Sequence, residues 1–108
     1  MTVELKRLDE VWTKDGERLG QARLLYHRTA AAEPADPDLK LYPAYLYVVS
    51  LEVGDDYYVP TLFIAGRDPG TNRVMLTATM ADVMEETWSR MPDFVAHGQA
   101  REEALPET

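Results

Sequence analysis

Apolar and polar side chains alternate along several stretches of the chain, and this period of two is typical of strands with one buried face. The clearest stretch is residues 41–53, in which every odd position from Tyr45 to Val53 is apolar or aromatic. The even positions are mixed and end in Ser50 and Glu52, so we expect the odd face to be buried. Strand patterns that are shorter or interrupted occur over residues 9–13, 19–27, 57–64 and 73–78.

Turn-forming residues separate these strands. The Asp15-Gly16 pair predicts a tight hairpin between the first two strands, because glycine adopts a positive φ without steric cost. Residues 54–56 and 68–72 predict two further reversals. Gly20 indicates a bulge or a close approach of two backbones, and Pro60, which cannot donate to a strand ladder, indicates an edge, a bulge or a bend.

Residues 29–39 predict a loop between the second strand and the clearest one. Pro34 and Pro37 stop any helix that the alanines at its start would favour. The loop is long for a small domain, and such loops are either tolerated surface insertions or functional segments.

The hydrophobic period changes from two to that of a helix after residue 78. Thr79 is a good N-cap, and Asp82 three residues later completes a pair that resembles a capping box. Apolar residues recur at helical spacing from Met80 to Trp88, and Pro92 ends the pattern. We therefore expect a helix of about three turns that lies against the sheet.

Five or six short strands followed by one short helix predict a mostly β fold, namely a small antiparallel β-barrel. Closure into a barrel would remove most exposed strand edges. We assign this domain to residues 1–92, and we expect residues 93–108 to form an acidic, partly ordered tail.

Composition narrows the class of partner. The length of 108 residues suits one domain, and a net charge of −8 disfavours nucleic acid and anionic membranes as partners. The chain has no cysteine, which excludes disulfides and thiol chemistry. The first ten residues are rich in charged side chains, which is unlike a secretory signal. The longest near-apolar run, residues 41–51, is too short to span a bilayer. We therefore expect a cytoplasmic protein without membrane insertion.

Motifs for catalysis or for a metal are missing from the sequence. The two histidines, His27 and His97, lie 70 positions apart, and the aspartates lack the spacing of a calcium-binding loop. Ser50 and Ser89 lack the flanking glycines of a nucleophile elbow. We expect no catalytic residue, no metal site and no cofactor.

Tyrosines are concentrated on two neighbouring predicted strands, and tyrosine is enriched at protein interfaces. The alternation directs Tyr45 and Tyr47 to the core. The other face would then expose an apolar patch for a protein partner or for a second copy of the chain. The candidate partner-binding residues are Tyr42, Leu46 and Val48, together with Tyr57 or Tyr58, of which one should be exposed.

Three segments together resemble the PRC-barrel family. Residues 11–20 are similar to its opening hairpin, with an Asp-Gly turn and a Leu-Gly step into the second strand. Residues 56–64 are similar to a later strand with a Val-Pro step, and residues 74–88 to its closing strand and short helix. The resemblance spans roughly residues 8–92 and implies a small barrel without a general catalytic site. In the photosynthetic reaction-centre H subunit and in a ribosome maturation factor, such domains act as protein-binding or assembly modules.

Two classes of function remain open. The first is a non-catalytic interaction or assembly module of the PRC-barrel type, which could self-associate as a homodimer. The alternative is a small-ligand-binding protein or an enzyme with a pocket between barrel and helix, near Trp88. Assistance in ribosome assembly, by analogy with the maturation factor, is a third possibility.

Overall fold

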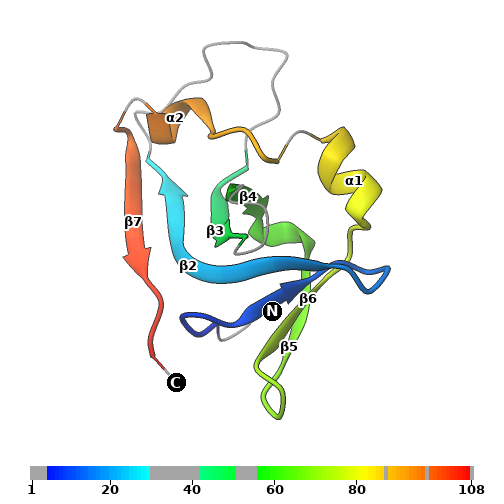
Figure 1. The fold of residues 1–108 in the computed structure, drawn as a ribbon. Helices are drawn as coiled ribbons and strands as arrows, with labels where there is room; N and C mark the ends of the chain where they lie inside the picture. The colour runs from blue at the N-terminus through cyan, green and yellow to red at the C-terminus, as the bar shows by residue number, and fades with distance from the viewer. Residues whose placement is uncertain (1–4, 30–41, 51–55, 87, 97, 108) are drawn as a thin grey trace.

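The computed structural model describes residues 5–29, 42–50, 56–86, 88–96 and 98–107 (Figure 1). Within these residues the chain is mostly β, with seven strands, one short 3₁₀ helix and two short α-helices. The elements, in chain order, are β1 (Glu10–Trp12), β2 (Arg18–Arg28), β3 (Ala44–Val49), β4 (Asp56–Pro60), η1 (Thr61–Phe63), β5 (Ile64–Asp68), β6 (Arg73–Leu76), α1 (Met80–Glu85), α2 (Asp93–Ala96) and β7 (Ala100–Ala104).

The seven strands form one sheet in the order β4-β3-β2-β1-β6-β5, with β7 paired to β2 outside this path. All pairs are antiparallel except β1 with β6, which are parallel. The expected strand over residues 57–64 is in fact two strands, because β4 ends at Pro60 and η1 redirects the chain into β5. The proline thus ends an edge strand, where its missing N–H costs no ladder bond.

The sheet curls without closing into a barrel. Its end strands β4 and β5 are not paired with each other in the described part of the chain, so the expected closed barrel is not confirmed. Only η1 separates these two strands in sequence, and a 3₁₀ helix rises about 2 Å per residue. The sheet must therefore bend until its two ends nearly meet.

Strand β2 has 11 residues and changes partner along one edge. Its first part pairs with β1 and its second part pairs with β7, while β3 runs along the other edge. The segment expected as a partly ordered tail thus contains α2 and β7, and β7 is part of the sheet. In Figure 1, β7 lies beside the upper half of β2 and descends toward the segment that precedes β1.

The hairpin and the glycine step predicted from the sequence are both present. Gly16 has φ of +84°, and the N–H of Thr13 donates to the carbonyl of Glu17 across the turn. At Gly20, an added Cβ would lie 2.3 Å from the carbonyl oxygen of Val49. A side chain at residue 20 would thus separate β2 from β3.

The predicted helix is shorter than expected. A capping box forms, because the Thr79 hydroxyl accepts from the Asp82 N–H while the Asp82 carboxylate accepts from the Thr79 N–H. However, α1 ends at Glu85 and has only six residues. A second helix, α2, follows Pro92 and was not expected.

Apolar side chains fill both faces of the β2–β3–β4 part of the sheet. One face belongs to the main core, which includes Leu46, Val48 and Val59. The other carries an aromatic cluster, which α2 covers with the fully buried Phe94. The buried members of this aromatic cluster are Tyr42, Tyr45, Tyr58 and Phe94.

The exposed patch expected from the alternation is therefore contradicted. Leu46 and Val48 are fully buried, and Tyr42, Tyr57 and Tyr58 are at most 8% exposed. Tyr45 is buried as expected, but the opposite face is buried too. Both faces of this sheet region are covered, and such strands lack a polar face to mark solvent. Residues 51–53 and most of the loop expected over residues 29–39 lie outside the described residues.

Candidate ligand-binding site

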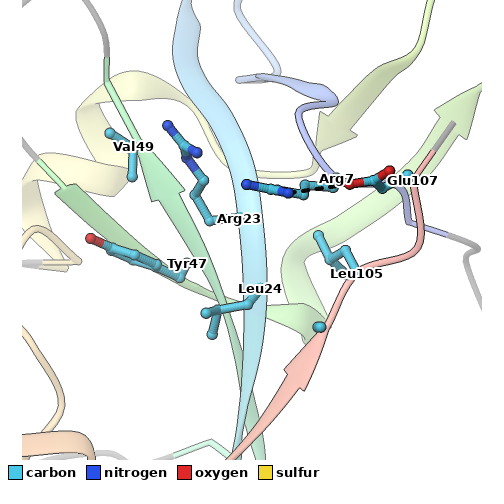
Figure 2. A pocket seen from close by; sticks show the side chains of 8 residues that line it. Arg7, Arg23, Leu24, Tyr47, Val49, Leu105 and Glu107 are labelled. Carbon is cyan, nitrogen blue, oxygen red and sulfur yellow. Dashed lines mark hydrogen bonds and ion pairs between the residues drawn. The ribbon is translucent and has the colours of Figure 1, made fainter.

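A pocket of about 580 Å³ opens on the sheet where β2 exchanges β1 for β7 as its neighbour. Its volume lies in the range of small-molecule sites. The floor is a row of register partners across three strands, with Leu24 between Tyr47 of β3 and Ala104 of β7. Figure 2 shows the eight lining side chains. The apolar and aromatic ones are Leu24, Tyr47, Val49, Ala104 and Leu105, and the charged ones are Arg7, Arg23 and Glu107.

A β-bulge carries Arg23. On β2, Ala22 pairs with Val48 and Leu24 pairs with Tyr47, so Arg23 is the additional residue between two consecutive residues of β3. A bulge leaves one residue out of the ladder and redirects its side chain. Arg23 is thereby a pocket-lining residue (Figure 2).

The Nε atom of Arg23 is buried and has no hydrogen-bond partner within the described residues. Buried polar atoms nearly always have such a partner. A buried donor without an acceptor costs about 1–3 kcal/mol, more if charged. A guanidinium is always charged and has five N–H donors. Arg23 therefore brings to the pocket a charged group with at least one donor that lacks an acceptor within the described residues.

The second arginine comes from the segment before β1. The Arg7 guanidinium lies 3.3 Å from the Glu107 carboxylate, and the Arg7 N–H donates to the carbonyl of Pro106 at 2.8 Å. The chain that precedes β1 and the chain that follows β7 are thus joined at the pocket rim. Both charged side chains remain largely exposed, at 47% and 79%, so this pair is a weak, water-accessible contact.

The ring of Tyr47, which is the aromatic part of the floor, is fixed by contacts with β4. Tyr47 stacks on Tyr58, with ring centroids 5.2 Å apart, and its hydroxyl donates to the Asp56 carboxylate at 2.8 Å. Burial raises the pKa of Tyr47 to about 12, and the hydrogen bond and negative charge of Asp56 act in the same direction. Tyr47 therefore stays protonated, and its ring is fixed by contacts on two sides.

The charge of this pocket differs from that of the chain. The chain carries a net charge of −8, whereas the pocket contains two arginines and one glutamate. Partly enclosed charges interact with a ligand more strongly than exposed ones, because less water screens them. The arrangement provides hydrogen-bond donors and positive charge above an apolar and aromatic floor.

The site differs from the one expected from the sequence. No candidate partner-binding residue lines the pocket, although the ring of Tyr58 stacks on that of Tyr47. Trp88 does not line this pocket: it is 5% exposed and packs on Phe63 at a centroid distance of 4.8 Å, and the expected pocket near it stays a prediction.

The bulge explains why the sequence did not reveal Arg23. A regular strand over residues 19–27 would place Ala22, Leu24 and Tyr26 on one face and Arg23 on the opposite face. The extra residue puts Ala22 and Leu24 on different faces. The adjacent apolar pair Leu24-Leu25, which breaks the period of two, was the available signal.

His27 lies outside the pocket and its Nε2 is 2.8 Å from Glu103, across the β2–β7 pair. His97 lies outside the described residues. Among the residues that are described, no group of three or more histidine, aspartate or glutamate side chains is placed to hold a metal ion. The described helices are all too short or too polar to cross a membrane.

Comparisons of this chain with protein-family models, with curated proteins and with solved structures found no match.

Proposed function

We propose that this chain is a non-catalytic binding module that holds a small molecule in the pocket at the β2 bulge. The buried Arg23 Nε, which lacks a partner within the described residues, is the observation that carries the proposal. A folded protein keeps such an atom at a cost in stability. Because Arg23 lines the pocket, a rotation of its side chain would bring this buried donor to a ligand acceptor and remove the cost. This is the second class of function expected from the sequence, with the pocket on a different part of the sheet.

The chemistry of the lining supports binding over catalysis. The described lining side chains include no serine, threonine, cysteine or histidine, so they offer no aliphatic hydroxyl, thiol or imidazole group for catalysis. The carboxylate in the lining, Glu107, is largely exposed and paired with Arg7. Tyr47 is held protonated by burial and by Asp56, which raise its pKa. What the pocket offers is apolar area, an aromatic ring and fixed positive charge.

A blocked-pocket variant tests the proposal. Ala104 is an exposed residue on the pocket floor, so Ala104→Trp would fill the pocket without entering the core. Ala65→Trp is the matched control, because Ala65 is also an exposed strand alanine but lies on β5 at the far end of the sheet. A fragment library is screened by thermal shift and by amide chemical shifts of the pocket strands.

We expect the screen to find compounds that raise the melting temperature of the unmodified chain and of Ala65→Trp, but not that of Ala104→Trp. A ligand specific to the folded state stabilises it by mass action. A screen without hits, or hits that bind Ala104→Trp equally well, would overturn the proposal.

The relationship to PRC-barrel domains stays a proposal. It is supported by the three sequence segments, by the mostly β fold, and by a curled sheet whose end strands are joined by η1. An interaction or homodimer function on this basis lacks its expected surface, since the patch residues are buried. Light scattering of the purified chain measures self-association directly, and a monomer at all concentrations would reject the homodimer.

A further inference from the structure

The proposed function leaves the ligand class open, and we infer that the ligand is a monocarboxylate with a compact apolar body. This inference rests on the proposed function and names its substrate class. It follows from three features of the pocket: the donor geometry of Arg23, the charge balance of the rim, and the composition of the floor.

The donor geometry favours a carboxylate. The Nε–H of a guanidinium and the neighbouring Nη–H point in parallel, so that together they bind the two oxygens of one planar carboxylate. In Arg23 the buried Nε has no hydrogen-bond partner among the described residues. A single neutral acceptor, such as a carbonyl oxygen, would satisfy Nε but would leave the positive charge without a counter-ion. A carboxylate satisfies both.

The charge balance favours one negative charge. Arg7 already has Glu107 as its partner, so the net positive charge of the lining side chains corresponds to Arg23 alone. A phosphate monoester carries close to two negative charges, and its second charge would share the pocket with the Glu107 carboxylate. Like charges at close range are unfavourable. A monoanion avoids this repulsion.

The floor requires an apolar body attached to the carboxylate. Leu24, Val49 and Leu105 present aliphatic surface, and the Tyr47 ring is locked by its stack on Tyr58. Apolar contact contributes about 25 cal/mol per Å² removed from water. A small carboxylate such as acetate has only one methyl group, so it would gain little of this contribution and would exchange strong hydration for one arginine. The carboxylate orients the ligand, and the apolar body provides most of the affinity.

Matched pairs of acids and amides test the inference on the unmodified chain. The probes are benzoate, 2-naphthoate and octanoate, each compared with its neutral primary amide, with acetate and 2-naphthyl phosphate as further controls. Titrations are followed by amide chemical shifts and by calorimetry. We expect at least one acid to bind at the pocket at least tenfold more tightly than its amide, and acetate not to bind at millimolar concentration. We also expect 2-naphthyl phosphate to bind more weakly than 2-naphthoate.

A pair of variants assigns the effect to Arg23. Arg23→Met keeps the apolar stem and removes the guanidinium, and Arg101→Met is the control, since Arg101 is an exposed arginine of β7 outside the lining. We expect Arg23→Met to abolish the preference for acid over amide, and Arg101→Met to leave it unchanged. If Arg23→Met fails to fold, the acid–amide comparison on the unmodified chain decides alone.

The outcomes separate this inference from the proposed function. Equal binding of acid and amide, tighter binding of the naphthyl phosphate, or no binding of the three acids would each overturn the carboxylate. In those cases library hits that Ala104→Trp blocks would still support a small-molecule pocket. If library and acids alike fail to bind, both are wrong.

Discussion

Asp9 and Arg67 form a two-bond ion pair inside the fold, with Arg67 Nε 2.6 Å from Oδ2 and Nη2 3.1 Å from Oδ1 of Asp9. Asp9 is 1% exposed and precedes β1, while Arg67 is on β5, two strands away across β6. The Lys6 N–H and the Asn72 side-chain oxygen complete the arrangement by bonding Asp9 and Arg67 respectively. The pair thus ties the start of the chain to the far end of the sheet.

Removing one partner of this pair should destabilise the protein strongly. Arg67→Met leaves the Asp9 carboxylate buried without its counter-ion, and we expect a loss of about 3–5 kcal/mol in the free energy of unfolding. Urea titration measures this loss. Arg7→Met breaks an exposed ion pair instead and should cost less than about 1 kcal/mol. The double variant Asp9→Asn/Arg67→Met tests the coupling of the two side chains. If its loss of stability equals the sum of the losses of the two single variants, the side chains are not coupled.

The close approach at Gly20 predicts a sharp difference between two glycines. Gly20→Ala places a Cβ 2.3 Å from the Val49 carbonyl oxygen, which is shorter than any normal contact, so we expect a loss of about 2 kcal/mol or more. Gly66→Ala on β5 meets no atom within 4 Å and should be neutral or stabilise by about 0.4–1 kcal/mol. Thermal unfolding of the two variants measures both effects. Similar melting temperatures would mean that β2 and β3 are not tightly apposed at this point.

Alkaline pH should reveal the environment of Tyr47. Its pKa is about 12 in the folded state against an ordinary value of 10.0, so above pH 10 the unfolded chain releases this proton and the folded chain keeps it. The contribution of this shift to stability is complete below pH 10 and is lost as pH rises through about 12. Tyr47→Phe removes this ionisation, and we expect its stability to fall less steeply above pH 10 than that of the unmodified chain. Urea unfolding at several alkaline pH values measures the slopes, and parallel slopes would contradict the shifted pKa.

Phe94 should anchor the chain after residue 92. Its side chain is fully buried and contacts Tyr45 at a ring-centroid distance of 5.7 Å. We expect Phe94→Ala to cost about 3–5 kcal/mol, as for other buried aromatic truncations. Leu62→Ala is the control, because Leu62 is 73% exposed and its loss should change stability by less than about 0.5 kcal/mol. A small effect of Phe94→Ala would instead fit the expected partly ordered tail.

Local chemistry determined the features that the sequence revealed by itself. The Asp15-Gly16 turn, the tight position of Gly20, the end of an edge strand at Pro60 and the Thr79 capping box each depend on a few neighbouring residues, and all four are present. The mostly β class follows in the same way from the alternation of side chains. Turns, caps and strand propensity act within a few residues, so a linear sequence contains them.

Only the tertiary structure decided which faces are buried, how the sheet is ordered and where a ligand fits. Leu46 and Val48 lie in the main core on one face of β3, while α2 covers the opposite face through Phe94. The contact that covers it joins Phe94 to Tyr45, more than 40 positions away. Arg23 lines a pocket because one bulge changes which residues of β2 face each side of the sheet, and because β7 replaces β1 as the neighbour of β2 at that point. Alternation along one strand does not specify what covers either face, since burial depends on segments that pack against it from elsewhere in the chain.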